Sequence, residues 1–246
     1  MLTIDGRSVP DTLAEIADPR HTALLVIDIQ NDNASERGIL AASGRDISWA
    51  RKIIPSVKLV LEEARRLDLL TVFMRRTRAA NDLLEPDNIL RKRARTVHSA
   101  GIAAYELEGT WGNEVLDELG PGPNEYQIVK YRASSFLGTP LDMLLRNVGV
   151  KAAVVVGLVT QGCVEATVRD LHQYGYYPVV LRDCVTGSRK DLHDSSLLVM
   201  SNTYDVVESR ELLSVWRGCS GATKRPMAAN RAYLKRNGAT LSARPG

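Results

Sequence analysis

The chain of 246 residues predicts a single α/β domain, a three-layer α/β/α sandwich around a mostly parallel sheet of about six strands. Short apolar runs rich in β-branched residues alternate with longer segments of helical period, which is typical of successive βαβ units. Hydrophobic residues make up 44% of the chain but aromatic residues only 5%, so Val, Leu, Ile and Ala must build the core. That composition favours a Rossmann-like parallel sheet with helices on both faces.

Six apolar runs are the candidate strands. Most of them end directly before a charged residue or a glycine, which places those residues at the carboxyl edge of the sheet. The runs cover residues 23–27, 70–74, 126–129, 152–156, 178–181 and 205–207.

Helical spacing of apolar residues predicts the intervening helices over residues 48–67, 140–148, 162–174 and 192–203. We expect Ser48 to cap the first of them and Pro140 to stand in the first turn of the second. Residues 76–109 have no clean period, so we expect an excursion with some helix. The basic run within it, residues 91–95, is best interpreted as a solvated face.

The net charge of +3 comes from the C-terminal end. Seven basic and no acidic residues follow position 216, which leaves 25 basic against 29 acidic residues before it. We therefore predict a folded domain over residues 1–217 and a basic tail over 218–246. Because only that tail has an excess of positive charge, nucleic-acid binding is not expected.

The sequence contains neither an apolar run long enough to span a membrane nor a basic-then-apolar signal pattern, so we expect a soluble cytoplasmic protein. Its three cysteines, Cys163, Cys184 and Cys219, are too few and too widely spaced for a disulfide framework or a zinc site. We expect Cys184 to be a small buried core residue and assign Cys219 no role.

Three side chains follow predicted strands: Asp28, Lys130 and, after a short turn, Cys163. Each alone has a simpler interpretation, as a helix cap, a solvated lysine or a packing residue. At one sheet edge, however, they would combine a base, a cation and a nucleophile, which is what covalent catalysis at a carbonyl requires. We expect a helix dipole and the ammonium to favour the thiolate of Cys163.

Three motifs carry a family resemblance: LVIDIQND at residues 25–32, KYRASSFLGTPL at 130–141 and GLVTQGCVEAT at 157–167. In this order they resemble the isochorismatase-like cysteine hydrolase superfamily over about residues 20–215. The sequence looks most like its amidohydrolase branch, which includes N-carbamoylsarcosine amidase, ureidoacrylate amidohydrolase and the biuret and triuret hydrolases.

The resemblance implies that Asp28 is the general base, Lys130 the charge-stabilising lysine and Cys163 the nucleophile. It also implies a cis peptide bond between Leu158 and Val159. The backbone N–H groups of Val159 and Cys163 would then form an oxyanion hole.

Members that bind a metal use an Asp and several His residues in the central excursion. Residues 75–110 contain a single histidine, His98, which is too few for such a site. We therefore predict no metal, no other cofactor and no nicotinamide turnover. Relatives often have an aromatic residue where this chain has Asn33, which indicates a polar, linear substrate. We also expect substrate contacts from Gln30 and Phe136 in the motifs, and from Trp111, which either packs structurally or shapes the site.

We therefore expect a cysteine-dependent amidohydrolase that cleaves a linear C–N bond of a small ureido, carbamoyl or carboxamide compound through a thioester. Two alternatives remain open. One is an isochorismatase-type ether or ester hydrolase, and the other is a catalytically retired homologue that acts as a binding module. The resemblance further implies a homodimer or homotetramer.

Overall fold

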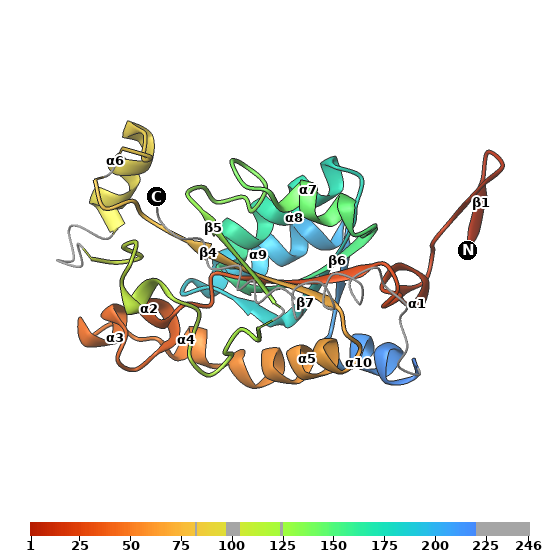
Figure 1. Cartoon of the computed structure of the whole chain (residues 1–246), viewed down its shortest axis with the longest axis horizontal. Coiled ribbons are helices and arrows are strands. Elements are labelled where there is room, and N and C mark those ends of the chain that lie inside the picture. Colours follow the sequence, from red (N-terminus) through yellow and green to blue (C-terminus); the bar gives the residue numbers. More distant parts are fainter. Residues whose placement is uncertain (82, 97–103, 124, 220–246) are drawn as a thin grey trace, which may run out of the picture.

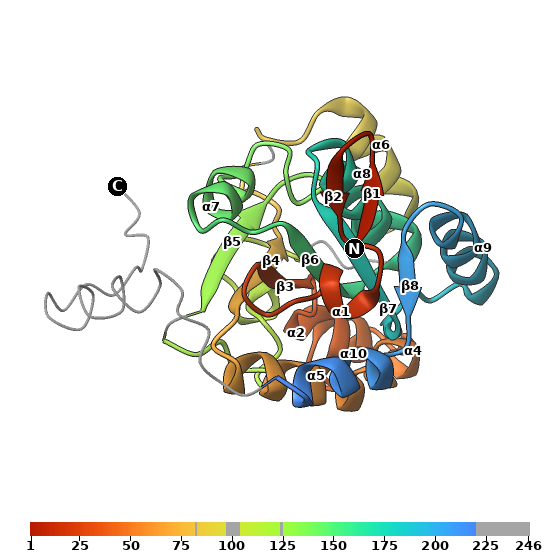
Figure 2. The same cartoon turned by 90° about the vertical axis from the view of Figure 1, so that its right-hand side faces the viewer.

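The computed structural model describes residues 1–81, 83–96, 104–123 and 125–219. Its centre is a six-stranded, entirely parallel sheet (Figure 1). The strand order is β5-β4-β3-β6-β7-β8, and Figure 2 labels all six strands. All six predicted strands are confirmed. Their bounds are β3 (Thr22–Ile27), β4 (Leu70–Arg76), β5 (Tyr126–Lys130), β6 (Ala152–Leu158), β7 (Tyr177–Thr186) and β8 (Asp205–Val207).

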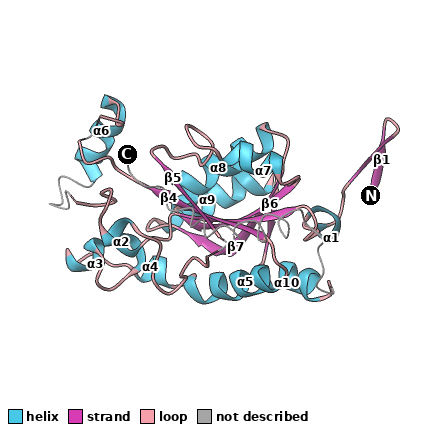
Figure 3. Cartoon of the chain, viewed as in Figure 1, coloured by secondary structure: helices cyan, strands magenta, loops and turns pink. Residues whose placement is uncertain are grey.

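Helices cover both faces of this sheet, which confirms the three-layer prediction (Figure 3). One face packs on α5 (Ile54–Arg66) and α10 (Ser209–Arg217). The other packs on α7 (Leu141–Asn147), α8 (Glu165–Gln173) and α9 (Lys190–Ser201).

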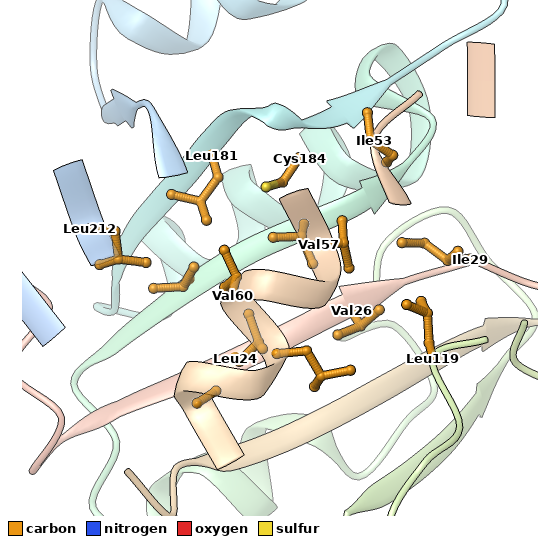
Figure 4. Packing of buried hydrophobic residues seen from close by; sticks show 14 of the residues in the cluster. Leu24, Val26, Ile29, Ile53, Val57, Val60, Leu119, Leu181, Cys184 and Leu212 are labelled. Atoms are coloured by element: carbon orange, nitrogen blue, oxygen red, sulfur yellow. The ribbon is translucent and has the colours of Figure 1, made fainter. Parts of the chain in front are cut away.

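Alternation along each strand divides the apolar side chains between the two layers. In β3, Leu24 and Val26 belong to the cluster under α5, whereas Leu25 and Ile27 belong to the opposite cluster. Figure 4 shows residues of the first cluster, including Cys184, which is fully buried as expected. Aliphatic side chains thus fill most of both core layers.

The predicted helix over residues 48–67 is broken into α4 (Ser48–Arg51) and α5. Pro55 stands at the start of α5, and because proline lacks an amide hydrogen it belongs in a first turn and interrupts a continuing helix. The prediction of Ser48 as a cap was wrong, because Ser48 is the first residue of α4 and donates its own N–H to Asp46 Oδ1 over 2.8 Å.

Several elements were not predicted. The strands β1 (Leu2–Ile4) and β2 (Arg7–Val9) form a hairpin that projects from the body of the molecule (Figures 1 and 2). The helix α10 was also missed, although a capping box between Glu208 and Glu211 precedes its apolar residues. The remaining short elements are α1 (Leu13–Ile16), α2 (Asn31–Ala34), α3 (Ile39–Ala42), α6 (Asp87–Thr96), the helical turn η2 (Trp111–Asn113) and the π-turn η3 (Thr160–Val164).

No helix within the described ranges is both long and apolar enough to cross a membrane. The last described helix, α10, ends at Arg217. Residues 220–246 of the predicted basic tail, and His98 in the central excursion, lie outside the described residues.

The strand order places a switch point between β3 and β6. From β3 the chain proceeds outward to β4 and β5, then returns to the other side of β3 as β6. In open α/β sheets, ligands bind at the carboxyl ends of the two strands that flank such a reversal. Asp28 and the turn containing Cys163 follow these two strands.

Gly157 allows β6 to approach β3 at this point. It is paired with Ile27 and has a φ of +129°. A Cβ atom at position 157 would lie 2.0 Å from the carbonyl oxygen of Ile27. The close approach and the backbone conformation both require glycine.

Candidate active site

Asp28 follows β3 as a buried carboxylate held in a defined orientation. Its main chain has a φ of +53°, and its N–H donates to Met74 O over 2.9 Å. Its Oδ1 accepts a hydrogen bond of 2.9 Å from the main-chain N–H of Arg76, and its Oδ2 accepts one of 2.8 Å from Lys130 Nζ. Both oxygens are therefore positioned by residues at the ends of β4 and β5.

Lys130 reaches Asp28 from β5, two strands away. Two strand spacings amount to about 10 Å, a distance that only a long side chain can bridge. Its Nζ also donates to the carbonyl oxygens of Arg132, at 3.2 Å, and Ala133, at 3.1 Å. Complete burial opposes the charge of Lys130, but the Asp28 carboxylate and the Cys163 sulfur outweigh it and raise its pKa. Lys130 is therefore a fixed cation.

Cys163 lies in η3, the turn that follows β6. Its carbonyl oxygen accepts a hydrogen bond of 2.7 Å from Thr167 Oγ1, which also lies 2.9 Å from Ser135 Oγ. The thiol interacts with the side chains of both Asp28 and Lys130. The structure thus brings together the three residues that the sequence singled out.

The thiol of Cys163 is held protonated. Burial raises its pKa to about 12, with a further contribution from the Asp28 carboxylate that exceeds the opposing effect of Lys130. The expectation of a stabilised thiolate was therefore wrong, because desolvation and a neighbouring anion outweigh one ammonium. A protonated thiol becomes a strong nucleophile only when a base removes its proton, and the Asp28 carboxylate lies beside this one.

The peptide bond between Leu158 and Val159 is cis in the turn that leads to Cys163. The carbonyl oxygen of Val159 accepts the N–H groups of Gly162, over 2.9 Å, and Val164, over 3.3 Å. The turn is therefore wound around this carbonyl. The two N–H groups predicted for an oxyanion hole, those of Val159 and Cys163, belong to this turn.

Two of the residues predicted to contact substrate, Gln30 and Asn33, donate hydrogen bonds to the main chain around the site. Gln30 is fully buried, and its Nε2 donates to Asn113 O over 2.8 Å and Arg76 O over 3.1 Å. The Nδ2 of Asn33 donates to Asp28 O over 3.1 Å, while its Oδ1 accepts the hydroxyl of Tyr105. Both side chains therefore hold the main chain around Asp28 in place.

The other two, Trp111 and Phe136, pack against neighbouring side chains. Trp111 is 40% exposed, stacks under the guanidinium of Arg37 at 4.6 Å and directs its Nε1 toward Asp117. Phe136 is buried and stacks on Tyr174 with 5.0 Å between ring centroids. Substrate contact by these two residues stays a prediction.

The sequence did not single out Tyr105 and Glu106, which the structure adds to the site. The hydroxyl of Tyr105 donates to Asn33, next to the loop of Asp28. The Glu106 carboxyl lies within electrostatic range of Asp28, Arg76 and Lys130. Both residues come from the non-periodic excursion, where no local pattern marks a site.

A hollow of about 530 Å³ lies beside the loop that follows Lys130. It is lined by Leu83, Leu84, Glu85, Pro86, Tyr131, Arg132, Leu137 and Gly138. Arg132 connects it to the site, because its carbonyl oxygen accepts from Lys130 Nζ. Among the residues that the structure describes, no three His, Cys, Asp or Glu side chains are grouped so that they could hold a metal ion.

Together, the fold and the Asp-Lys-Cys cluster define a hydrolase-type site at the switch point of a parallel sheet. Residues 22–211 match the model of the isochorismatase domain, and the chain belongs to this family.

Among its relatives, the ureidoacrylate amidohydrolase RutB of Enterobacter sp. (strain 638) is 30% identical over 83% of this chain and 90% of that protein. The ureidoacrylate amidohydrolase RutB of Caulobacter segnis is 36% identical over 68% of this chain and 72% of that protein. The solved structure of N-carbamoylsarcosine amidase from Thermoplasma acidophilum matches with a TM-score of 0.59 and 26% identity, covering 77% of this chain and 96% of that one.

Proposed function

We propose that the chain is a cysteine-dependent amidohydrolase that cleaves a linear C–N bond in a small ureido, carbamoyl or carboxamide compound through a thioester. The observation that carries the proposal is the convergence of the Asp28 carboxylate, the Lys130 ammonium and the Cys163 thiol. Relatives that are amidohydrolases support a C–N bond as the target.

In the first half of the reaction, Asp28 takes the proton of the Cys163 thiol as the sulfur attacks the carbonyl carbon. Lys130 remains charged and stabilises the anionic sulfur. The carbonyl oxygen becomes an oxyanion, which accepts hydrogen bonds donated by the N–H groups of Val159 and Cys163. The C–N bond then breaks, and protonated Asp28 gives its proton to the leaving nitrogen.

In the second half, water replaces the departed amine or ammonia. Asp28, ionised again, takes a proton from this water as its oxygen attacks the thioester carbon. The C–S bond breaks, the acid leaves, and the proton on Asp28 returns to the sulfur. Every step uses groups that belong to this chain, and the enzyme ends in its starting protonation state.

Ammonia release from a panel of small amides and ureides tests the proposal. The panel comprises carbamoyl amino acids, biuret, triuret, ureidoacrylate analogues, maleamate and nicotinamide. We expect turnover of at least one linear compound by the wild type and by Cys184→Ala, and none by Cys163→Ala. Activity on an ether or ester that survives Cys163→Ala but is lost in Asp28→Ala would instead support a hydrolase of the isochorismatase type. Absence of ammonia release from every compound would favour the ether or ester hydrolase or the retired homologue.

We also propose that the chain assembles as a homodimer or homotetramer. Exposed apolar side chains on α9 support this, since Leu198 is 74% exposed and Val199 52% exposed. Light scattering of the purified protein tests it, and a monomeric mass at micromolar concentration would contradict it.

A further inference from the structure

Glu106 has an unusual backbone conformation, and its main-chain N–H and carbonyl group form three hydrogen bonds with neighbouring residues. Its φ is +56°, in the left-handed region that non-glycine residues rarely adopt. Its N–H donates to the buried carboxylate of Asp32 over 2.8 Å. Its carbonyl oxygen accepts from the N–H of Arg78, over 2.8 Å, and from Nδ2 of Asn113, over 3.2 Å. This segment is therefore fixed against the ends of the strands.

The Glu106 side chain extends from this anchored backbone toward the catalytic cluster. Its carboxyl interacts electrostatically with Asp28 after β3, Arg76 at the end of β4 and Lys130 at the end of β5, and it is in hydrogen-bond contact with the hydroxyl of Tyr105. It is the second carboxyl group at the cluster. Burial raises its pKa to about 7, an effect that Arg76 opposes and Asp28 reinforces.

The carboxylates of Asp28 and Glu106 differ in the hydrogen bonds that they already accept from the protein. Both oxygens of Asp28 accept hydrogen bonds from the protein, one from Arg76 N and one from Lys130 Nζ. The side chain of Arg76 is also engaged, because it donates to Thr77 O and pairs with Glu85 over 3.0 Å. An ionised carboxylate offers about four acceptor positions. The half-buried carboxyl of Glu106 is in hydrogen-bond contact with the hydroxyl of Tyr105, and its other acceptor positions have capacity for donors that a substrate supplies.

We propose that Glu106 accepts an N–H of the substrate's amide or carbamoyl group and so selects amides and ureides over esters at the same thiol. This inference rests on the proposed function. In an ester, an oxygen replaces the N–H, so the donor is lost and a lone pair faces the Glu106 carboxylate. The attack of Cys163 on the carbonyl carbon would be the same for both substrates. Glu106 is then a specificity-determining residue, distinct from the base Asp28.

The test compares an amide with the ester of the same acyl group, in wild type, Glu106→Gln and Glu108→Gln. Glu108 is an exposed carboxylate two residues away and serves as the matched control. Loss of a hydrogen bond to a charged group predicts a fall of about 10- to 100-fold in kcat/KM for the amide in Glu106→Gln. The ester value should not fall by more than about threefold, because Glu106→Gln also removes the repulsion of the ester oxygen, and a retained ester value shows that the variant is folded.

The pH profile adds a readout that a structural role would not give. We expect the wild-type kcat/KM for the amide to rise with pH through an apparent pKa near 7, as Glu106 ionises, and this limb to be absent in Glu106→Gln. Equal losses for amide and ester, or an unchanged amide value, would overturn the role of Glu106 alone. Failure of the wild type on every amide would overturn the proposed function as well.

Discussion

Cys163, which is half-buried, and Cys184, which is fully buried, are two thiols of the same domain, and they differ in the charged groups beside them. Burial raises the pKa of both. Cys184 lies in the apolar layer under α5 and α10, and the carboxylate next to it, Asp183, is engaged by the N–H and hydroxyl of Ser209 at the start of α10.

Cys163 instead faces a carboxylate that is paired with a buried ammonium. Burial by itself makes a thiol inert, because it disfavours the thiolate. A buried base together with a cation makes it usable, because the base removes the proton and the cation stabilises the resulting anion.

The largest expected effect separates the two thiols directly. Cys163→Ala should lower kcat for amide hydrolysis by at least about 10³-fold, because removing a nucleophile eliminates the covalent pathway. Cys184→Ala should leave kcat within about threefold and lower the free energy of unfolding by about 1 kcal/mol, the cost of a small cavity. Steady-state ammonia release and urea denaturation measure the two quantities. Comparable kcat losses in both variants would refute the distinction.

The next effect concerns the buried Asp28–Lys130 pair. Lys130→Met should destabilise the fold by about 3–5 kcal/mol, because Asp28 would remain as an uncompensated buried charge. The exposed pair of Arg169 and Glu165 in α8 provides a control, and Arg169→Met should cost less than about 1 kcal/mol. Urea denaturation at pH 7 compares the two. Similar costs would mean that Asp28 does not depend on Lys130 for its charge.

A smaller effect tests how β6 brings Cys163 close to Asp28. Gly157→Ala should cost at least about 1–3 kcal/mol and reduce activity, since its new Cβ would overlap the carbonyl of Ile27. Gly175→Ala is the matched control. Gly175 also has a positive φ, of +86°, but no heavy atom lies within 4 Å of its Cβ position. If the two variants unfold at the same urea concentration, the close approach of the strands is unimportant.

The smallest expected effect concerns the reactivity of the resting thiol. With its pKa raised to about 12, Cys163 should react with iodoacetamide more slowly than free cysteine at pH 7.5, and the rate should keep rising through pH 10. Asp28→Asn should increase the rate at pH 8, about tenfold or less, because it removes the anion while Lys130 remains. Mass spectrometry of the labelled peptides separates Cys163 from Cys184. A rate plateau below pH 8 would contradict the raised pKa.

Slow alkylation therefore does not identify a retired homologue in this fold. A thiol that depends on a neighbouring base in the transition state is unreactive toward a reagent that this base does not assist. Turnover, and not labelling, distinguishes the active enzyme from an inactive relative.

The sequence predicted the parallel sheet and the position of Asp28, Lys130 and Cys163, because apolar runs mark strands and the residues that follow them meet at one edge. It did not predict the hairpin at residues 2–9, whose strands are mostly exposed and carry no core signal. The helix α10 could have been found from its capping box and the spacing of Leu212, Leu213 and Trp216.

The place of Glu106 could not be predicted for a different reason. Its backbone is fixed by Asp32, 74 residues earlier in the chain, and its side chain meets groups from three strands. The pKa of Cys163 likewise depends on the balance between burial, Asp28 and Lys130 in three dimensions. Local patterns identify which residue types are present, but such a balance exists only after folding.

Partitioning with hydroxylamine tests the central claim, a thioester on Cys163, most directly. An amide and an ester of the same acyl group are hydrolysed in the presence of hydroxylamine, and the ratio of the hydroxylamine adduct to the free acid is measured for each. A common thioester predicts the same ratio from both substrates and loss of both products in Cys163→Ala. Different ratios, or amide turnover that persists without the thiol, would contradict the account.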